Sequence, residues 1–179
     1  GGAGPQVEAG IAALAALFPG AERLLGEAAT AAALCRQAPQ AELLHLACHG
    51  EFRGDSPLYS ALHLADGVLS AGEIERLPLQ AALVVLSACE TALGDVGAGD
   101  EGVGLVRAFL IAGAARVLGS LWQVDDADTA AFMQRFHAAW RGGGCAVAAL
   151  RRAQLEQREQ RPHPYHWAAF TLHGGGRAL

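Results

Sequence analysis

Short apolar runs alternate along this chain with longer segments in which apolar residues recur every three or four positions. The runs at 43–48, 82–88 and 117–122 have the length of buried strands. Further strands are predicted at 22–25 and 167–172. Strands that are apolar along their whole length are buried on both faces, so the pattern predicts a doubly wound α/β fold with a mainly parallel sheet.

The longer segments predict helices that connect these strands. The first covers 7–18 and ends at a Pro-Gly pair, and a second, capped by the threonine at its start, covers 30–38. Further helices are predicted near 103–110, across 132–140, where aromatic residues recur every four positions, and over 145–160. Helices in these places would cover both faces of the sheet.

A β-hairpin interrupts this alternation in the first half of the chain. Residues 58–64 and 68–69 flank Asp66-Gly67, a pair typical of a tight hairpin turn. Ser70 and Glu73 then have the spacing of a capping box, which predicts a short helix that ends near residue 78.

Composition restricts the classes of protein to which the chain can belong. Its 179 residues, 52% hydrophobic and 17% charged, suit one compact domain with a substantial core. All 13 basic residues are arginines, they form no cluster, and the net charge is -5, so we expect no direct contact with nucleic acid. No apolar run has the length of a membrane span and no signal peptide opens the chain, which favours a cytoplasmic protein that contacts no membrane. Met133 is the single methionine, so we expect the sequence to be part of a longer protein.

The four cysteines are spread along the chain and form no CxxC pair. That spacing predicts neither a disulfide framework nor a zinc site, and a reducing compartment is the simpler setting. We expect no metal ion and no organic cofactor.

Two residues with nucleophilic or basic chemistry follow predicted strands directly. His49 comes after the strand at 43–48, and Cys89 comes after the strand at 82–88. If these strands are neighbours, the imidazole and the thiol share the carboxyl edge of the sheet, where α/β proteins place their sites. A histidine can activate a thiol, and the N–H groups of Gly50 and Cys89 could stabilise an oxyanion. The pattern describes acyl transfer through a thioester, although a cysteine at a strand end is more often a small packing residue.

The same residues belong to a longer series of motifs that resembles the CHAT domain, a caspase-like family of clan CD cysteine peptidases. The motifs, in order, are HLACHG at 45–50, SPLYSAL at 56–62, LSACET at 86–91, RAFLIAGA at 107–114, SLWQVDD at 120–126, HP at 163–164 and WAAF at 167–170. The sequence departs from the family pattern at Cys48, where threonine is more frequent, and at Ala92, where glycine is frequent. Neither change removes a catalytic group.

The resemblance implies a caspase-like three-layer αβα sandwich with a mainly parallel central sheet and a small β-hairpin insertion. It implies a cysteine endopeptidase in which His49 is the base and Cys89 the nucleophile, acting on a protein or peptide. CHAT domains usually follow tetratricopeptide-type repeats, so we expect such repeats in the full-length, bacterial-type protein, where they would regulate the peptidase. The expected domain covers 20–174, after a leader region at 1–19 and before a tail at 175–179.

Residues in the loops at the same edge of the sheet are candidates for contact with substrate. They are Glu90, Trp122, Asp125 and Asp126. The acids among them could favour a basic residue at P1, the substrate residue before the scissile bond. The plainer interpretation is that they are solvated loop acids.

The remaining cysteines and histidines favour structural roles. Cys48 is expected on the face opposite His49, in the core, and His45 is expected to be a hydrogen-bonded core histidine. Cys145 lies at a helix start, where the dipole can lower its pKa, but no base lies near it in sequence. His163 precedes a proline and shares an HxxH spacing with His166, which does not suit a helical metal site.

Two alternative functions compete with the peptidase. Gly97, Gly99 and Gly102 form a GxGxxG pattern typical of dinucleotide-binding proteins. The pattern starts several residues after the strand and contains two acids, which would repel a pyrophosphate. The other alternative is a latent or non-catalytic recognition module with the same fold.

Overall fold

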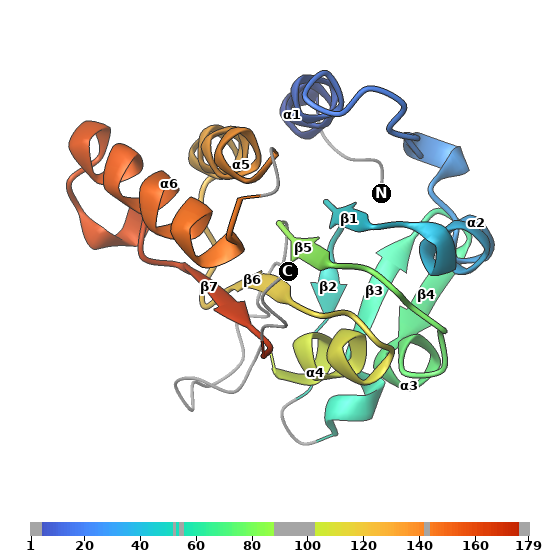
Figure 1. The fold of residues 1–179 in the computed structure, drawn as a ribbon. Coiled ribbons are helices and arrows are strands. Elements are labelled where there is room, and N and C mark those ends of the chain that lie inside the picture. The colour runs from blue at the N-terminus through green and yellow to red at the C-terminus, as the bar shows by residue number, and fades with distance from the viewer. Residues whose placement is uncertain (1–4, 52, 54–55, 88–102, 142–143, 176–179) are drawn as a thin grey trace.

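A four-stranded sheet forms the centre of the molecule (Figure 1). The computed structural model describes residues 5–51, 53, 56–87, 103–141 and 144–175. The strand order is β1-β5-β6-β7. The bounds are Leu43–Leu46 for β1, Leu83–Leu86 for β5, Val117–Ser120 for β6 and Phe170–His173 for β7.

The strands run mainly in parallel, as the sequence predicts. β1 pairs with β5 in parallel, with Leu46 opposite Leu86, and β5 pairs with β6 in parallel. The edge strand β7 is antiparallel to β6. The carboxyl ends of β1, β5 and β6 therefore meet at one edge of the sheet.

Helices cover both faces of this sheet (Figure 1). One layer contains α1 (Pro5–Ala15), α5 (Asp126–Trp140) and α6 (Ala146–Gln160). The other contains α2 (Ala31–Gln37), α3 (Ala71–Ile74) and α4 (Val103–Ile111). Along β5, Leu83 and Val85 join the core beneath the first layer, whereas Val84 and Leu86 join the core beneath the second. This alternation places the strand between two apolar layers.

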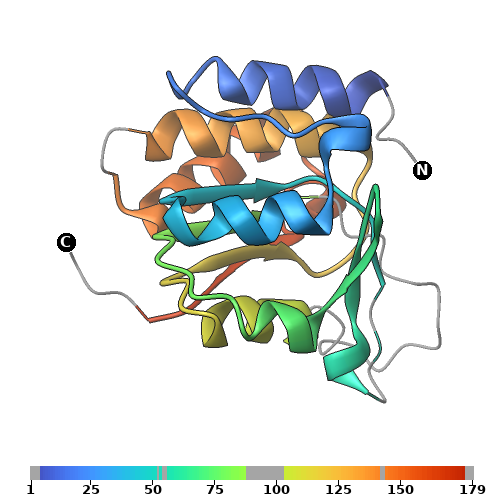
Figure 2. The same ribbon diagram turned by 90° about the vertical axis from the view of Figure 1, so that its right-hand side faces the viewer.

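A second, antiparallel sheet lies at the carboxyl edge of the first one. It contains β2 (Gly50–Glu51), β3 (Ala61–Leu64) and β4 (Gly67–Ser70), in that order. Figure 2 shows the β3–β4 hairpin beside the end of the main sheet toward which β1 points. The Asp66 carboxylate at the hairpin turn accepts a hydrogen bond from the Ala31 N–H at 2.7 Å, so the turn is tied to the start of α2.

Local sequence signals account for most of these boundaries. Thr30 caps α2 through the Ala33 N–H, and Ser70 and Glu73 form the predicted capping box at α3. Short 3-10 turns complete the chain: η1 (Gly26–Ala28), η2 (Ala38–Gln40), η3 (Pro57–Tyr59) and η4 (Pro164–His166). In the described part of the chain, no helix combines the length and apolar character that a membrane crossing requires.

The strand predicted at 22–25 is wrong. These residues have no regular structure, and Leu24 and Leu25 line a cleft instead of joining a sheet edge. The hairpin also begins later than expected, because Pro57 opens the 3-10 turn η3 and β3 starts only at Ala61. The α/β class and the mainly parallel sheet are confirmed, whereas the division into 1–19, 20–174 and 175–179 stays a prediction.

Gly113 makes the tight turn between α4 and β6 possible. Its φ is +115°, and a Cβ built there would overlap the carbonyl oxygen of Leu79. We expect Gly113→Ala to lower the free energy of unfolding by about 2–3 kcal/mol, because backbone strain and overlap add. Gly20, with φ +86° and no atom near its Cβ position, is the matched control; Gly20→Ala should cost about 1 kcal/mol. Urea denaturation of both variants measures the difference, and equal losses would contradict the steric argument.

Candidate functional site

A cleft of about 730 Å³ opens at the carboxyl edge of the main sheet. Its walls come from α1, the segment before α2, the end of β1, the small sheet, the end of β6 and the start of α5. The polar residues that line it are Glu27, His49, His63, Ser87, Ser120, Gln123, Asp125, Asp126, Thr129 and Tyr165. The cleft lies at the edge of the sheet where the sequence predicts a site, and it includes His49.

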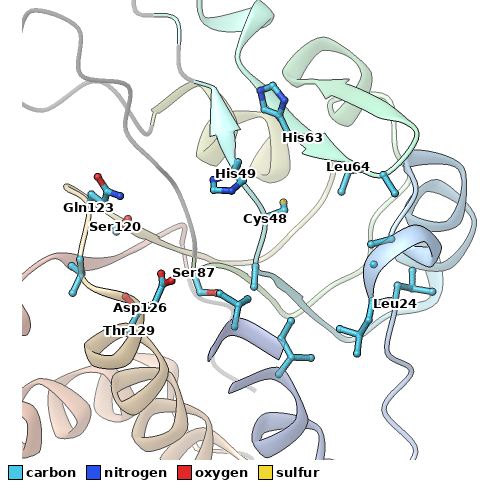
Figure 3. A pocket seen from close by; sticks show the side chains of 18 of the residues that line it. Leu24, Cys48, His49, His63, Leu64, Ser87, Ser120, Gln123, Asp126 and Thr129 are labelled. Carbon is cyan, nitrogen blue, oxygen red and sulfur yellow. The ribbon is translucent and has the colours of Figure 1, made fainter. Parts of the chain in front are cut away.

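One wall carries two histidines. His49 lies between the end of β1 and the start of β2, its side chain is exposed, and it lines the cleft beside His63 of β3 (Figure 3). The His63 N–H donates to the His49 carbonyl oxygen at 2.8 Å, which fixes the backbone of His49 against the small sheet. The predicted base thus lies on a supported turn between two sheets.

Gly50 follows His49 on β2, the edge strand of the small sheet. It is paired with Leu62, while the His49 carbonyl oxygen accepts from the His63 N–H. In an antiparallel ladder this makes Gly50 part of a pair without direct hydrogen bonds, so its N–H points away from β3. Gly50 is buried and is not among the residues that line the cleft, so its predicted role as an oxyanion donor stays a prediction.

The opposite wall carries two of the predicted acids. Asp125 caps α5, with its Oδ1 accepting from the Ala127 N–H at 2.9 Å, and both Asp125 and Asp126 line the cleft. Figure 3 shows Asp126 beside Ser87 and Thr129, across the cleft from His49. Among the described residues of the lining there is no arginine to balance these acids.

Trp122 does not line the cleft itself. Its ring packs on the core beneath α5, and its indole N–H donates to the Tyr165 carbonyl oxygen at 3.0 Å. The Tyr165 hydroxyl in turn donates to the Gln123 carbonyl oxygen at 2.7 Å. Trp122 therefore supports the wall through Tyr165 instead of facing a ligand.

An ion-pair cluster holds η4 against α5 at this wall. Asp128 is only 6% exposed, and its Oδ2 lies 2.6 Å from His166 Nδ1 and 3.2 Å from the Arg161 guanidinium. His163, one of the histidines of the HxxH pair, accepts from the Tyr165 N–H through its Nδ1. These contacts give both histidines structural roles, and in the described part of the chain no three potential ligands lie close enough to hold a metal ion.

A hydrogen-bonded chain of side chains runs from the cleft into the core. Ser87, the residue after β5, is 8% exposed, and its Oγ lies 2.8 Å from His45 Nε2. His45 Nδ1 lies 3.0 Å from Nε2 of His137, which is on α5 and 1% exposed. His45 is hydrogen-bonded, as predicted, and by exposure it is half-buried. Below, His45 and His137 are called the imidazole pair.

Burial keeps the imidazole pair neutral. Desolvation, with a smaller contribution from the neighbouring His137, lowers the pKa of His45 to about 3. Desolvation lowers the pKa of His137 to about 4. Each ring therefore carries one proton at neutral pH.

Three of the sequence predictions lie outside the described residues. They are the nucleophile Cys89, the loop acid Glu90 and the glycine pattern of Gly97, Gly99 and Gly102. In contrast, sequence reasoning missed Ser87, His63 and Gln123 as cleft residues. Ser87 was open to prediction, because it ends the same apolar run that precedes Cys89.

Comparison with known families is decisive at this point. The sequence matches the family model of the CHAT domain over residues 2–175. The chain is a CHAT domain. CHAT domains are caspase-like, and the mainly parallel sheet between two helical layers agrees with that fold.

Two curated relatives of this CHAT domain are both named tetratricopeptide repeat protein 28. The mouse protein is 40% identical over 113 residues, which is 62% of this chain and 5% of the mouse protein. The human protein is 36% identical over 130 residues, which is 72% of this chain and 5% of the human protein. The CHAT domain thus spans about a twentieth of these relatives, and their names agree with the expected association with such repeats. A bacterial source has no support from these mammalian proteins.

The described thiols of the CHAT domain differ in their surroundings. Cys48 lines the cleft but is half-buried against the core beneath α2 to α4, and desolvation raises its pKa to about 11. Cys145 is exposed before α6, and the backbone N–H groups of Ala148 and Val147 lower its pKa. Cys35 packs half-buried on α2.

This difference predicts the order of alkylation. With iodoacetamide at about pH 8, Cys145 should react at least about 100-fold faster than Cys48, because the thiolate is the reactive form. Peptide mapping by mass spectrometry after short exposures measures the two rates. The urea-unfolded chain is the control, in which both thiols should react at similar rates; fast reaction of Cys48 in the folded chain would contradict its burial.

The imidazole pair predicts a pH dependence of stability. In the unfolded chain both rings take up protons below their ordinary pKa of 6.5, whereas the folded chain resists protonation until about pH 4. The unfolded state then binds more protons, so the free energy of unfolding falls as the pH falls from 6.5 toward 4. Each ring contributes a slope of about 1.4 kcal/mol per pH unit once it is protonated in the unfolded chain.

Replacement of one ring tests the sign and the size of this slope of the free energy of unfolding with pH. His137→Phe should make the dependence shallower by about 1.4 kcal/mol per pH unit between about pH 5.5 and 4.5. Urea denaturation at a series of pH values gives the slope for each protein, and carboxylate titration cancels in the comparison. Equal slopes would show that His137 is protonated in the folded chain.

Proposed function

We propose that this CHAT domain is a cysteine endopeptidase in which His49 and Cys89 form the catalytic dyad. The observation that carries the proposal is the parallel pairing of β1 with β5, in register up to Leu46 and Leu86. It brings His49 and Ser87 to the same cleft. Cys89 follows Ser87 by two residues, so covalent geometry limits the separation of their Cα atoms to about 7 Å.

The chemistry is acyl transfer through a thioester. His49 takes the proton of the Cys89 thiol, and the thiolate attacks the carbonyl carbon of the scissile peptide bond. The tetrahedral intermediate collapses when the C–N bond breaks and the imidazolium gives its proton to the leaving amine. Water, deprotonated by His49, then hydrolyses the thioester and releases the carboxylic acid and the free thiol.

Backbone N–H groups would stabilise the oxyanion of this intermediate. We propose the N–H groups of Gly50 and Cys89 for this role. The support for Gly50 is the direction of its N–H, which points away from β3 on the edge strand of the small sheet. Donors that are fixed before the reaction stabilise the developing charge without reorganisation.

The dyad predicts that catalysis is lost with either partner. Cys89→Ala should abolish cleavage of a fluorogenic peptide library, and His49→Ala should lower kcat/KM by about 10²–10⁴-fold, the usual contribution of a general base. Labelling by a peptide acyloxymethyl ketone, detected by intact mass, should fall in both variants. Every protein compared in this experiment carries Cys145→Ser, because the exposed Cys145 thiol would itself react with such probes.

His63→Ala is the matched control, because His63 lines the same wall of the cleft without a proposed role in the reaction. It should keep most of the activity. Equal labelling of Cys89 with and without His49 would contradict the dyad. Failure of the Cys145→Ser protein to cleave or to be labelled, also when the repeats of the full-length protein are present, would reject the peptidase and leave a recognition module with the same fold.

We propose further that the cleft prefers a basic P1 residue. Its described lining contains Glu27, Asp125 and Asp126 and no arginine. Asp126 is the strongest candidate, because the Asp125 carboxylate is engaged as the cap of α5. A guanidinium in a partly desolvated cleft can donate a charge-assisted hydrogen bond to such a carboxylate.

Asp126→Asn tests this preference. It should lower the ratio of kcat/KM for P1 arginine over P1 glutamine by about 5- to 10-fold, which corresponds to about 1 kcal/mol. Glu159→Gln on α6, which removes one charge outside the lining of the cleft, is the control and should leave the ratio unchanged. An unchanged ratio in Asp126→Asn would reject the assignment.

We also propose that tetratricopeptide-type repeats in the full-length protein regulate the peptidase, and that the protein acts in the cytoplasm. The names of the two relatives support the repeats. The absence of paired cysteines among the described residues is consistent with a reducing compartment.

A further inference from the structure

The hydrogen-bonded row of side chains from Ser87 to His137 ends at an atom that lacks a hydrogen-bond partner among the described residues. His137 Nδ1 is buried and has no hydrogen-bond partner among the described residues. Since both rings of the imidazole pair are neutral, only two arrangements of their protons satisfy both the Ser87–His45 and the His45–His137 hydrogen bonds.

In the first arrangement, each donated hydrogen points inward, from the cleft toward the core. The Ser87 hydroxyl donates to His45 Nε2, His45 Nδ1–H donates to His137 Nε2, and His137 is left with a proton on Nδ1. That proton would be a buried N–H donor with no acceptor among the described residues. Orphaned N–H donors are the rarest unsatisfied groups in protein interiors.

In the second arrangement, protons point outward to the cleft. His137 Nε2–H donates to His45 Nδ1, and His45 Nε2–H donates to the Ser87 hydroxyl oxygen. His137 Nδ1 then keeps only an unfilled lone pair, which costs less than an orphaned donor. This arrangement is the more stable of the two.

The outward arrangement leaves the hydrogen of the Ser87 hydroxyl for another acceptor. The Leu46 carbonyl oxygen lies 3.5 Å from Ser87 Oγ, at the limit of a hydrogen bond, and already accepts from the Ser87 N–H at 3.0 Å. Ser87 also lines the cleft (Figure 3). A hydroxyl that accepts from one donor becomes a stronger donor itself.

We propose that the Ser87 hydroxyl is a hydrogen-bond donor to a backbone carbonyl oxygen of the peptide bound in the cleft, oriented by the imidazole pair. Ser87 is thus a substrate-binding residue, and His45 and His137 are positioning residues that act through it. The assignment rests on the proposed peptide substrate, but not on the chemistry at Cys89.

Ser87 is not a second nucleophile, although serine, histidine and a third group in a row resemble a hydrolase triad. A general base must take the serine proton at neutral pH, and burial lowers the pKa of His45 to about 3. The third group is the neutral His137, which does not stabilise an imidazolium as a carboxylate would. The geometry therefore suits orientation of the hydroxyl and not its ionisation.

The tautomers can be observed without any activity. In ¹⁵N-labelled protein at about pH 7, long-range ¹H–¹⁵N spectra should show both rings of the imidazole pair protonated on Nε2. His45→Gln and His137→Gln assign the two signals. Protonation on Nδ1 in both rings would mean that Ser87 donates inward, which overturns the proposal whether or not the chain is a peptidase.

Peptide binding tests the role of the hydroxyl. In the Cys89→Ala, Cys145→Ser protein, Ser87→Ala should weaken the binding of a basic peptide by about 5-fold, as expected for one neutral hydrogen bond, while Ser87→Thr should restore it. In the active protein, Ser87→Ala should raise KM by a similar factor and leave kcat nearly unchanged. Calorimetry and steady-state kinetics measure the two effects.

Ser120→Ala is the matched control for these measurements. Ser120 is the last residue of β6, at the same edge of the sheet, and it lines the cleft. In the described part of the chain, no histidine forms a hydrogen bond with its hydroxyl. We expect a loss below 2-fold for Ser120→Ala. Equal losses for the two serines, or unchanged binding in Ser87→Ala, would overturn the role proposed for the Ser87 hydroxyl and the imidazole pair. Binding that depends on Ser87 in a protein without cleavage would instead reject only the peptidase.

Discussion

The parallel pairing of β1 with β5 is the constraint on which the site depends. Because both strands run in the same direction and stay in register up to Leu46 and Leu86, the segments that follow them leave the sheet at one edge. His49 and Ser87 consequently line the same cleft. A slip of one residue would turn His45 toward the opposite core and separate it from both Ser87 and His137.

The same pairing explains why a polar chain of side chains can exist inside an apolar molecule. On β1, Leu44 and Leu46 pack on the core beneath α2 to α4, whereas His45 faces α5 and meets His137 there. Two neutral rings and a hydroxyl satisfy each other except at one lone pair, so the desolvation cost stays small. The row of Ser87, His45 and His137 therefore connects the core to the cleft without placing a charge on either ring.

The walls of the cleft are held by contacts that lie outside it. The Asp66 carboxylate ties the hairpin to α2, and the buried Asp128 holds η4 through His166 and Arg161. Trp122 and Tyr165 link η4 to the segment after β6. These contacts tie the hairpin and η4 to neighbouring elements, which suits a site that must keep donors and acceptors in place before a substrate binds.

The sequence by itself determined the elements and the edge of the sheet at which to look. Apolar runs, the Thr30 cap and the capping box at Ser70 act within a few residues, and they predicted the main helices and the central strands, although α3 ends at Ile74 and not near residue 78. They failed at 22–25, because an apolar pair does not reveal whether it will join a sheet or line a cleft. Only the tertiary structure decided that Ser87, His45 and His137 form one hydrogen-bonded row. His45 is 42 positions from Ser87 and 92 positions from His137 in the sequence, and the three side chains meet through strand register and helix packing.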